Sequence, residues 1–292
     1  MTNKNKYISP FTDFGFKHIF GQPNNKEFLI DFLNALFKND PDFEPIVDVH
    51  YLNNEEGKFH RDERGVIYDI KCHTSAGKDF IVEMQNSAQP YFINRSLYYW
   101  AKAIAQQGAQ GEQWRFDFSP LYIIAFMNFQ HSGLDTKVIS DIALCDVNSH
   151  KQISDKLRFI YIQLPLFKNK EEECKNEIEE WLFNLKNMET MDTLAFKTHK
   201  NLFDRLEKVT SYANLSESEK RKYDEDLKNF RDLDNTLYYR EQIGIEKGIE
   251  QGIEKGKAEL LKAFRNSGMG TDQISNITKI PVSEIEYLLG LN

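Results

Sequence analysis

The sequence predicts an α/β domain built on a mixed sheet flanked by helices, followed by an α-helical C-terminal extension. The apolar segments are ordered as a helix, three strands, a helix and two further strands, which is typical of layered α/β domains. The two strands expected between residues 66 and 85 are mostly apolar on both faces, so helices should cover both sides of the sheet. Beyond about Met188 the chain is charged and helix-prone, with sparse apolar anchors, which predicts the extension.

Each element follows from a local pattern. The chain opens with the aromatic segment YISPFTDFGFKHIFG, and helical spacing of apolar residues then predicts a helix ending near Phe37. Strands are expected at 46–52, 66–74, 78–85, 121–128 and 157–164, and helices at 90–107 and 171–186. We expect three parts: a domain at 1–187, a helical extension at 188–240, and a glycine-repeat helix with a small helical tail at 241–292.

Composition limits the classes of function. The chain has 292 residues and a net charge of -8, which argues against a broad basic surface, so any nucleic-acid contact must be local. The three cysteines show no metal-ligand spacing, and their odd number without a signal sequence indicates a reducing cytosol. The longest strongly apolar run, 121–127, is too short to span a bilayer. We therefore expect a soluble cytoplasmic protein without a membrane partner.

The stretch VIYDIKCHTSAGKDFIVEMQ, residues 66–85, predicts a β-hairpin that carries Asp69 on its first strand and Glu83 on its second. A three-residue turn at 75–77, with Gly77 in the left-handed conformation, pairs Thr74 with Lys78. This register sets Asp69 opposite Glu83, with β-carbons within about 5 Å on one face. A two-residue turn would instead separate the two carboxylates onto opposite faces.

Two like charges side by side in such a sheet are costly unless a positive group holds them. A divalent metal is one answer, because clustered carboxylate oxygens suit Mg²⁺ or Mn²⁺. Lys71 on the same predicted face is the other, since it can neutralise one carboxylate in a structural ion pair. The residues alone leave both interpretations open.

Other polar residues are candidates for a site. Arg95, Tyr99, Lys102 and Gln106 recur at helical spacing, and such a stripe can contact phosphates and stack on bases. A solvated helix face is the competing interpretation. Glu27 lies in the first turn of a predicted helix, where the helix dipole favours a carboxylate whether or not it serves a site.

The segment IGIEKGIEQGIEKGKAE repeats every four residues and sets four glycines along one slowly drifting stripe of a helix. Each glycine costs a helix about 1 kcal/mol relative to alanine, so packing against a partner would stabilise it. We expect a self-association helix, with a flexible charged linker as the alternative. The tail predicts two small helices. The second carries Glu284 and Glu286 and no basic residue, which favours a structural or oligomerising pair over a DNA-reading one.

Several of these pieces together resemble a known family. They are FTDFGFKHIFG near the start, YDIKC around Asp69, IVEMQ from Ile81 to Gln85, and QPYFINRSLYYWAK after it. In order and spacing they resemble the PD-(D/E)XK nuclease family transposases, also called recombination-promoting nucleases. The glycine repeats and the helical tail are similar to that family's C-terminal region, so the resemblance covers most of the chain.

The resemblance implies a Mg²⁺-dependent DNA endonuclease with a restriction-endonuclease-like core, linked to recombination or mobile elements. Carried over by motif, Asp69 and Glu83 are metal ligands and the Met84 main-chain carbonyl is a third. The wider superfamily has a lysine two residues after the glutamate, where this chain has Gln85. A neutral amide can orient water or phosphate but brings no charge.

The resemblance leaves the missing positive charge to Lys71 or Lys17. Arg95 and Tyr98 become candidates for phosphate contacts, and Asp13 joins Glu27 as a candidate neighbour of the site. Two hypotheses remain. The first is a metal-dependent DNA endonuclease, favoured by the carboxylate pair. The second is a catalytically weak or inactive nuclease fold that binds DNA or protein and self-associates, as a dimer, through its C-terminal helices. Gln85 and the acidic net charge favour the second.

Overall fold

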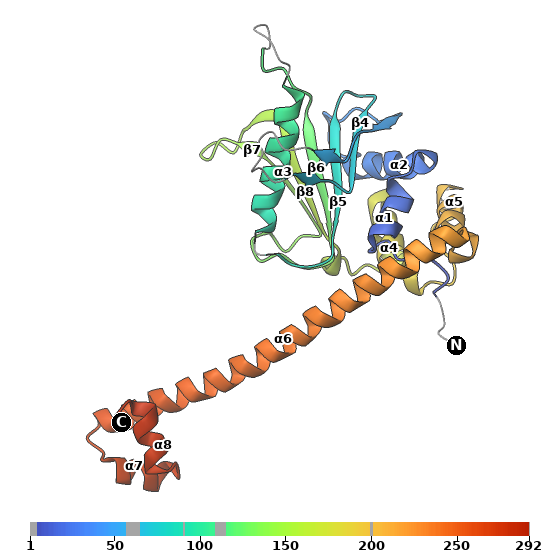
Figure 1. Cartoon of the computed structure of the whole chain (residues 1–292). Coiled ribbons are helices and arrows are strands. Elements are labelled where there is room, and N and C mark those ends of the chain that lie inside the picture. The colour runs from blue at the N-terminus through green and yellow to red at the C-terminus, as the bar shows by residue number, and fades with distance from the viewer. Residues whose placement is uncertain (1–4, 57–64, 90, 109–114, 199–200, 292) are drawn as a thin grey trace. The chain divides into compact units, whose positions relative to one another are not determined.

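The computed structural model describes residues 5–56, 65–89, 91–108, 115–198 and 201–291. These form two compact units, residues 1–227 and 228–292. The helices and strands, shown in Figure 1, are α1 (Asp13–Phe20), α2 (Lys26–Phe37), β1 (Val49–Tyr51), β2 (Glu55–Glu56), β3 (Val66–Ile67), β4 (Ile70–Thr74), β5 (Asp79–Gln85), α3 (Phe92–Gln107), β6 (Leu121–Met127), β7 (Ile139–Cys145), β8 (Gln152–Gln163), α4 (Glu177–Asn187), α5 (Asn201–Thr210), α6 (Glu217–Asn266), α7 (Thr271–Thr278) and α8 (Val282–Leu289). Short 3-10 helices lie at Pro23–Asn25, Leu164–Leu166, Glu171–Glu173, Met188–Thr190 and Tyr212–Asn214.

The centre of the first unit is a six-stranded sheet with the order β1-β4-β5-β6-β8-β7. Its β5–β6 and β6–β8 pairs are parallel, whereas β1–β4, β4–β5 and β7–β8 are antiparallel. The predicted mixed sheet is therefore confirmed. The helix α3 follows β5 and leads into β6, which is the kind of crossover that two parallel neighbours require.

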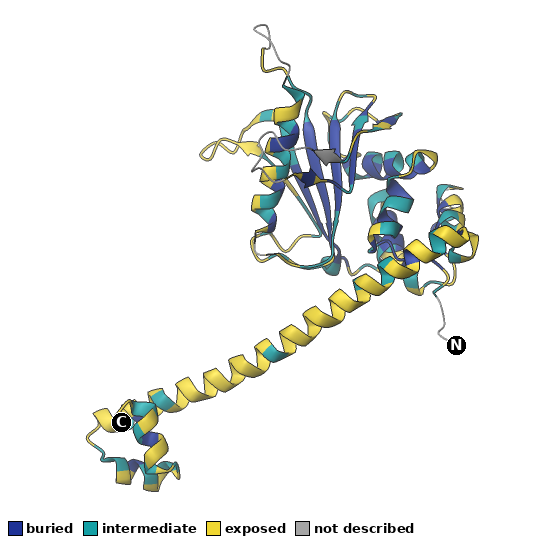
Figure 2. Ribbon diagram, viewed as in Figure 1, coloured by how far each residue is buried: buried dark blue, intermediate teal, exposed yellow. Residues whose placement is uncertain are grey.

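Both faces of the sheet are covered, as the apolar strands predicted. One face packs against α1, α2, α4 and α5 in an aromatic core that includes Phe20, Phe32, Phe126 and Trp181. The other face packs against α3 through Phe92 and Ala103. Burial colouring shows the central strands almost uniformly buried between these layers (Figure 2).

The hairpin has the predicted register at its turn, but its first strand is interrupted. Cys72 faces Phe80 and Ile70 faces Val82, and Gly77 has the left-handed φ of 73° that the turn requires. The expectation of one continuous strand from residue 66 was wrong. The chain leaves the ladder at Tyr68–Asp69, because the Asp69 N–H and C=O bind the side chains of Glu83 and Asn54 rather than a strand.

This interruption also changes which face two side chains take. Because side chains alternate between the two faces of a continuous strand, Val66 and Tyr68 would lie on the same face as Ile70 and Cys72. In the structure Val66 and Tyr68 instead pack with Ile81 in the core beneath α3, whereas Ile70 and Cys72 belong to the opposite core.

The opening aromatic segment forms helix α1, which is fixed at its N-terminus by local contacts. Thr12 caps the helix by accepting the Gly15 N–H at 3.0 Å. A side chain at Gly15 would place its Cβ 2.0 Å from the Ser9 carbonyl oxygen, so only glycine allows this approach. The chain therefore presents Asp13 and Lys17 on one turn, joined by an ion pair of 2.6 Å.

Three elements differ from the expected ranges. The strand expected at 46–52 is shorter, as β1. The strand expected at 157–164 begins earlier, at Gln152, because it continues into a hairpin with β7 that the sequence did not reveal. The helix expected at 171–186 divides into a 3-10 turn and α4, which begins where Asn176 caps it by accepting the Glu179 N–H. The expected helix start at Pro90 lies outside the described residues.

The second unit, residues 228–292, consists of α6 from Lys228 onward together with α7 and α8. It has a small core of its own, in which Leu261, Ile274 and Ile285 are buried. The glycine repeats lie within α6, so that segment is helical and not a flexible linker. No described helix is long and apolar enough to cross a membrane.

Candidate active site

The two carboxylates of the hairpin meet on one side of the sheet. The Asp69 backbone N–H donates to Glu83 Oε1 at 3.2 Å, and the Met84 backbone N–H donates to Asp69 Oδ2 at 2.8 Å. Each carboxylate thus accepts a backbone N–H from the other residue's strand. The register that places Asp69 opposite Glu83 is the reason for this reciprocity, since Ile70 and Val82 are the last paired residues before it.

The Met84 carbonyl points toward the same side of β5. In an extended strand the N–H and C=O of one residue face the same neighbouring strand. The Met84 N–H faces Asp69, and the next carbonyl along, that of Gln85, faces the other way and accepts the Asn128 N–H. The Met84 carbonyl is therefore directed to the side where Asp69 lies and where the β4 ladder has ended.

Burial raises the pKa values of both carboxyl groups. Glu83 is 7 % exposed, and burial followed by the nearby Asp69 charge raises its pKa to about 8. Burial also raises the pKa of Asp69, although the Met84 N–H and the charge of Lys17 oppose this shift. Among the described residues, no lysine or arginine forms an ion pair with either group. The two carboxyl groups are therefore held together without an ion pair, and their raised pKa values show that a second negative charge is disfavoured there.

A positive charge reaches the pair from α1. Burial disfavours the charged form of Lys17, but its bond to Asp13 and the charges of Asp69 and Glu83 outweigh this and raise its pKa. Asp226 of α6, a residue that the sequence did not single out, accepts the Phe14 N–H at 2.7 Å. Burial and the Asp13 charge raise the pKa of Asp226.

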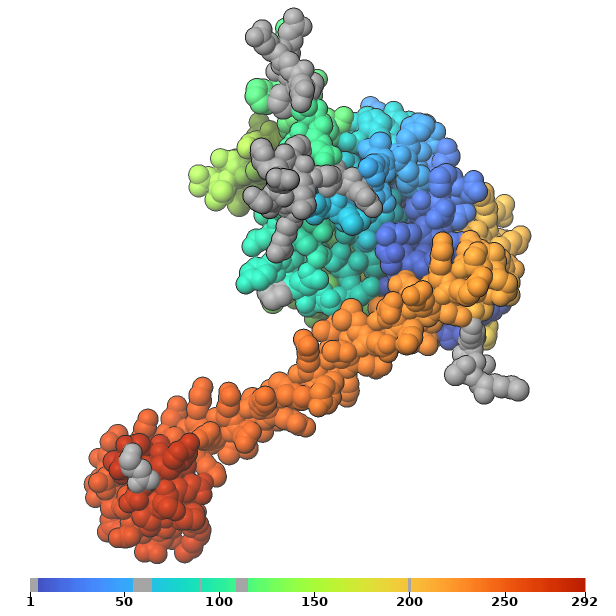
Figure 3. Space-filling model, viewed as in Figure 1, coloured from blue at the N-terminus to red at the C-terminus, as the bar shows by residue number. Residues whose placement is uncertain are grey.

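Helix α3 contributes the other cation, and its residues form part of the surface of the first unit (Figure 3). Arg95 donates through Nη2 to Gln85 Oε1 and through Nη1 to Gln89 Oε1, the second at 2.6 Å. The Gln85 amide in turn donates to Glu83 Oε2 at 3.1 Å. Burial raises the pKa of Tyr99, as do the charges of Glu83 and Asp69, so its hydroxyl also lies within electrostatic reach of the pair.

The other α3 candidates, Tyr98 from the family resemblance and Lys102 from the polar stripe, differ in exposure. Tyr98 is exposed, which suits contact with a ligand in solution. Lys102 is only 3 % exposed, so it does not lie on a solvated helix face, and its Nζ lies 5.9 Å from the centre of the Tyr98 ring. It flanks Ala103, which is part of the buried face of the helix.

Lys71 and Glu27 occupy other surroundings. Lys71 is buried, with its Nζ 5.6 Å from the Tyr68 ring centre. The charges of Lys17 and Arg95 lower the pKa values of both carboxyl groups. Glu27 lies in the first turn of α2 and pairs with Arg205 of α5 at 3.0 Å.

Asn54 is a structural part of the site that sequence reasoning missed. Its amide donates to the Asp69 carbonyl at 2.7 Å and its side-chain oxygen accepts the Lys71 N–H at 3.2 Å. These bonds hold the backbone where it leaves the ladder and so position Asp69. The sequence holds no signal that marks Asn54.

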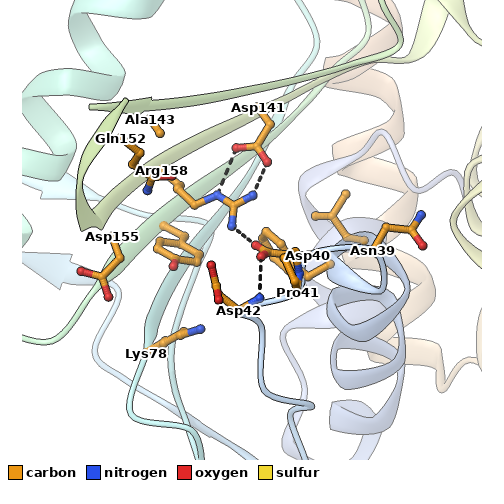
Figure 4. Close-up of a pocket in the computed structure, with 13 residues that line it drawn as sticks. Asn39, Asp40, Pro41, Asp42, Lys78, Asp141, Ala143, Gln152, Asp155 and Arg158 are labelled. Atoms are coloured by element: carbon orange, nitrogen blue, oxygen red, sulfur yellow. Dashed lines mark hydrogen bonds and ion pairs between the residues drawn. The ribbon is translucent and has the colours of Figure 1, made fainter. Parts of the chain in front are cut away.

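A cavity of about 610 Å³ lies away from the carboxylate pair, between the end of α2 and the β7–β8 hairpin (Figure 4). At its centre Arg158 binds Asp40 and Asp141, and its guanidinium carbon lies 5.1 Å from the Phe37 ring centre. These contacts join α2 to β7 and β8, so the arginine has a structural role. The lining residues are Leu36, Phe37, Asn39, Asp40, Pro41, Asp42, Lys78, Tyr122, Asp141, Ala143, Gln152, Asp155 and Arg158.

The residues around the pair fit a hard divalent cation. Within the described part of the chain no three or more His, Cys, Asp or Glu side chains form a metal cluster. Two carboxylates and a main-chain carbonyl are nevertheless an all-oxygen donor set, and Mg²⁺ commonly completes its octahedron with water or phosphate oxygens. Two adjoining carboxyl groups with raised pKa values and no ion pair are the observation that a bound cation would explain, because a cation favours the charged form of both.

The family comparison agrees with this geometry. A family model described as PD-(D/E)XK nuclease family transposase matches residues 10–240. The chain belongs to this family. No curated protein and no solved structure matches the chain.

Membership in the PD-(D/E)XK nuclease family transposases supports a nuclease- or transposase-related role, and the mixed sheet flanked by helices is consistent with a restriction-endonuclease-like fold. Nucleases of this type generally use divalent metal ions, and the nuclease family implies a DNA substrate. The matched residues include the whole of the carboxylate pair and α3, and they end before the glycine repeats.

Proposed function

We propose that this chain is a divalent-metal-dependent DNA endonuclease that hydrolyses phosphodiesters with a metal-activated water. The observation that supports this most is the reciprocal hydrogen bonding of Asp69 and Glu83. It holds buried Glu83 and partly buried Asp69 together where neither forms an ion pair with a described residue. The family description suggests a link to recombination or mobile elements.

In this proposal Asp69, Glu83 and the Met84 carbonyl hold Mg²⁺ or Mn²⁺. When bound, such an ion polarises the scissile phosphate and lowers the pKa of an attacking water. The protein's own part is to fix the ligand oxygens. The backbone N–H groups of Asp69 and Met84 each bind one oxygen of the pair, and the Gln85 amide binds Glu83 Oε2, so both carboxyl groups are held in place where they would ligate an ion.

Cationic and aromatic side chains then bind the DNA backbone. Lys17 supplies positive charge beside the carboxylates, because its charge acts on both of them. Tyr98 on the exposed side of α3 can stack on a base or donate to a phosphate. We assign Gln85 to orient water or phosphate through its amide.

Incubation of the purified chain with supercoiled plasmid, with Mg²⁺ or with EDTA, tests the function. We expect nicking only with Mg²⁺, and its loss in Asp69→Asn and Glu83→Gln, because each removes one ligand charge. Asp135→Asn is the matched control, since Asp135 is an exposed carboxylate whose recorded ion pair is with Lys137. Equal nicking by Asp69→Asn and the wild type would overturn the assignment.

A second candidate function is a weakly active or inactive nuclease fold that binds DNA or protein and self-associates. Gln85 favours it, because a neutral amide stands where the superfamily has a lysine. Exposed isoleucines in α6 favour it too: Ile245, Ile249 and Ile253 are 49 %, 58 % and 57 % exposed. The repeat glycines have open space around them, with no atom within 4 Å of an added Cβ, so packing within the chain does not require them.

We infer that this stripe of α6 pairs with a second copy of the chain, giving a dimer. Truncation before Ile243 should lower the mass measured by light scattering, and Ile249→Lys should do the same without removing the helix. Gln251→Lys introduces the same change of charge at a neighbouring exposed position and should leave the mass unchanged. An unchanged mass for the truncated chain would refute the pairing.

A further inference from the structure

Four side chains form a hydrogen-bonded line from α3 to the carboxylate pair. Gln89 accepts from Arg95, Arg95 donates to Gln85, and Gln85 donates to Glu83. The guanidinium lies between two aromatic rings, 5.7 Å from the centre of Phe92 and 5.8 Å from that of Tyr99. Arg95 therefore donates to two acceptors and lies beside two rings, which gives it one defined position.

This position decides which end of the Gln85 amide faces the carboxylates. A guanidinium can only donate, so the Gln85 oxygen must face Arg95. The Gln85 NH₂ group consequently faces Glu83 Oε2. The reversed amide would oppose NH₂ to guanidinium and oxygen to carboxylate, so both contacts would be repulsive.

We propose that Arg95 is the positioning residue for Gln85: it orients the amide as a donor toward the carboxylate site and supplies beside it the positive charge that the amide lacks. The inference rests on the proposed nuclease function and deepens it. Arg95 and Gln85 together then do what one lysine does in the wider superfamily. The lysine's charge and its donor are divided between two residues on two elements, α3 and β5.

A direct phosphate contact is the competing role for Arg95, and the two roles differ in what they change. A phosphate contact contributes to DNA affinity in every background and carries a salt dependence. A positioning role changes the rate of cleavage of bound DNA, and only while residue 85 is an amide that needs orienting. A lysine at position 85 would need no orientation and would be repelled by the nearby guanidinium.

The test is a double-mutant cycle of Arg95→Met and Gln85→Lys, with single-turnover cleavage of a labelled duplex in Mg²⁺. Affinity is measured separately by fluorescence anisotropy in Ca²⁺. We expect Arg95→Met to slow cleavage about a hundredfold in the wild-type background, the usual size for loss of an oriented donor. In the Gln85→Lys background the same change should have no effect or increase the rate. DNA affinity should change less than about threefold throughout.

Mn²⁺ binding to the DNA-free chain, measured by calorimetry, adds a readout that does not depend on cleavage. Arg95→Met should bind Mn²⁺ at least as tightly as the wild type, because both carboxylates keep their backbone donors and lose a neighbouring positive charge. Arg115→Met, which removes an exposed arginine outside the site, is the control and should change neither rate nor Mn²⁺ affinity.

Results other than those expected would contradict either the positioning role of Arg95 or the nuclease function. An equal loss of rate in both backgrounds, or a tenfold loss of DNA affinity, would identify a phosphate contact and overturn the positioning role. Weaker Mn²⁺ binding by Arg95→Met would overturn it as well, since it indicates a disturbed site. Absence of Mg²⁺-dependent cleavage by the wild-type chain would overturn the nuclease function itself, and this inference with it.

Discussion

Replacement of Glu83 by glutamine removes a buried carboxyl group that must take up a proton to stay beside Asp69 in the metal-free fold, and we expect the replacement to stabilise that fold. The folded pKa of Glu83 is about 8, against an ordinary value of 4.5. The folded chain therefore binds more protons than the unfolded chain between these values, so the stability of the wild type falls as pH rises through that window. At about 1.4 kcal/mol per pKa unit, the cost near pH 7 is about 3 kcal/mol.

The gain in the free energy of unfolding is reduced because Glu83→Gln loses one hydrogen bond. A glutamine at position 83 can still accept the Asp69 N–H, but its NH₂ group would face the Gln85 amide, which costs about 1 kcal/mol. The net stabilisation is then about 2 kcal/mol, or about 5 °C in the unfolding midpoint for a unit of this size. Below about pH 4.5 the difference should vanish or reverse, because both side chains are then neutral.

Thermal unfolding followed by circular dichroism, in EDTA and in excess Mg²⁺, measures the stability difference between Glu83→Gln and the wild type. Mg²⁺ at a hundredfold excess over Kd should add about 3 kcal/mol to the unfolding free energy of the wild type and so raise its midpoint. It should leave the midpoint of Glu83→Gln nearly unchanged. Asp135→Asn is again the control. A variant less stable than the wild type in EDTA at neutral pH, or stabilised equally by Mg²⁺, would refute the reasoning.

Three further predictions concern lysines and an aromatic residue of the site. Lys17→Met should slow plasmid nicking by about tenfold or more, because the Lys17 charge acts on both carboxyl groups. Lys71→Met should change nicking less than about threefold, because the Lys71 ammonium lies against the Tyr68 ring. A larger effect of Lys71→Met than of Lys17→Met in the same assay would contradict this. Lys102→Ala should lower the free energy of unfolding in urea by about 1–2 kcal/mol, because its stem is buried, with little change in DNA affinity once folded. Tyr98→Ala should weaken DNA binding in an anisotropy titration by about tenfold without moving the urea midpoint, since the ring is exposed; unchanged affinity would remove Tyr98 from the interface.

The position of Asp69 opposite Glu83 could be predicted because it depends only on the number of residues in the hairpin turn. The turn at 75–77 fixes the register, Gly77 identifies the turn, and the register fixes which residues stand opposite each other. The nearness of Lys17 and Arg95 to the pair was expected only from the family resemblance and from position along the chain. Their contacts depend on how α1 and α3 pack on the sheet.

Other features could not be read from the pattern because they depend on tertiary contacts. The strand is interrupted before Ile70 because the Asp69 backbone C=O and N–H bind the side chains of Asn54 and Glu83. Asn54 lies outside the hairpin sequence, so the hairpin pattern does not reveal this contact. Lys102 follows a polar spacing yet is buried, because it flanks the packed face of α3. The β7 strand alternates weakly and is mostly exposed, so its composition does not distinguish it from a loop.

The central claim is that Asp69 and Glu83 hold one divalent cation together. Crystals of the chain soaked in Mn²⁺ and measured at the manganese absorption edge test it without any need for cleavage. We predict one strong anomalous peak between the two carboxylates and the Met84 carbonyl, with oxygen ligands at about 2.1 Å, close to the distances of Mg²⁺. A pair that stays free of anomalous density, with manganese bound only elsewhere on the chain, would contradict the claim.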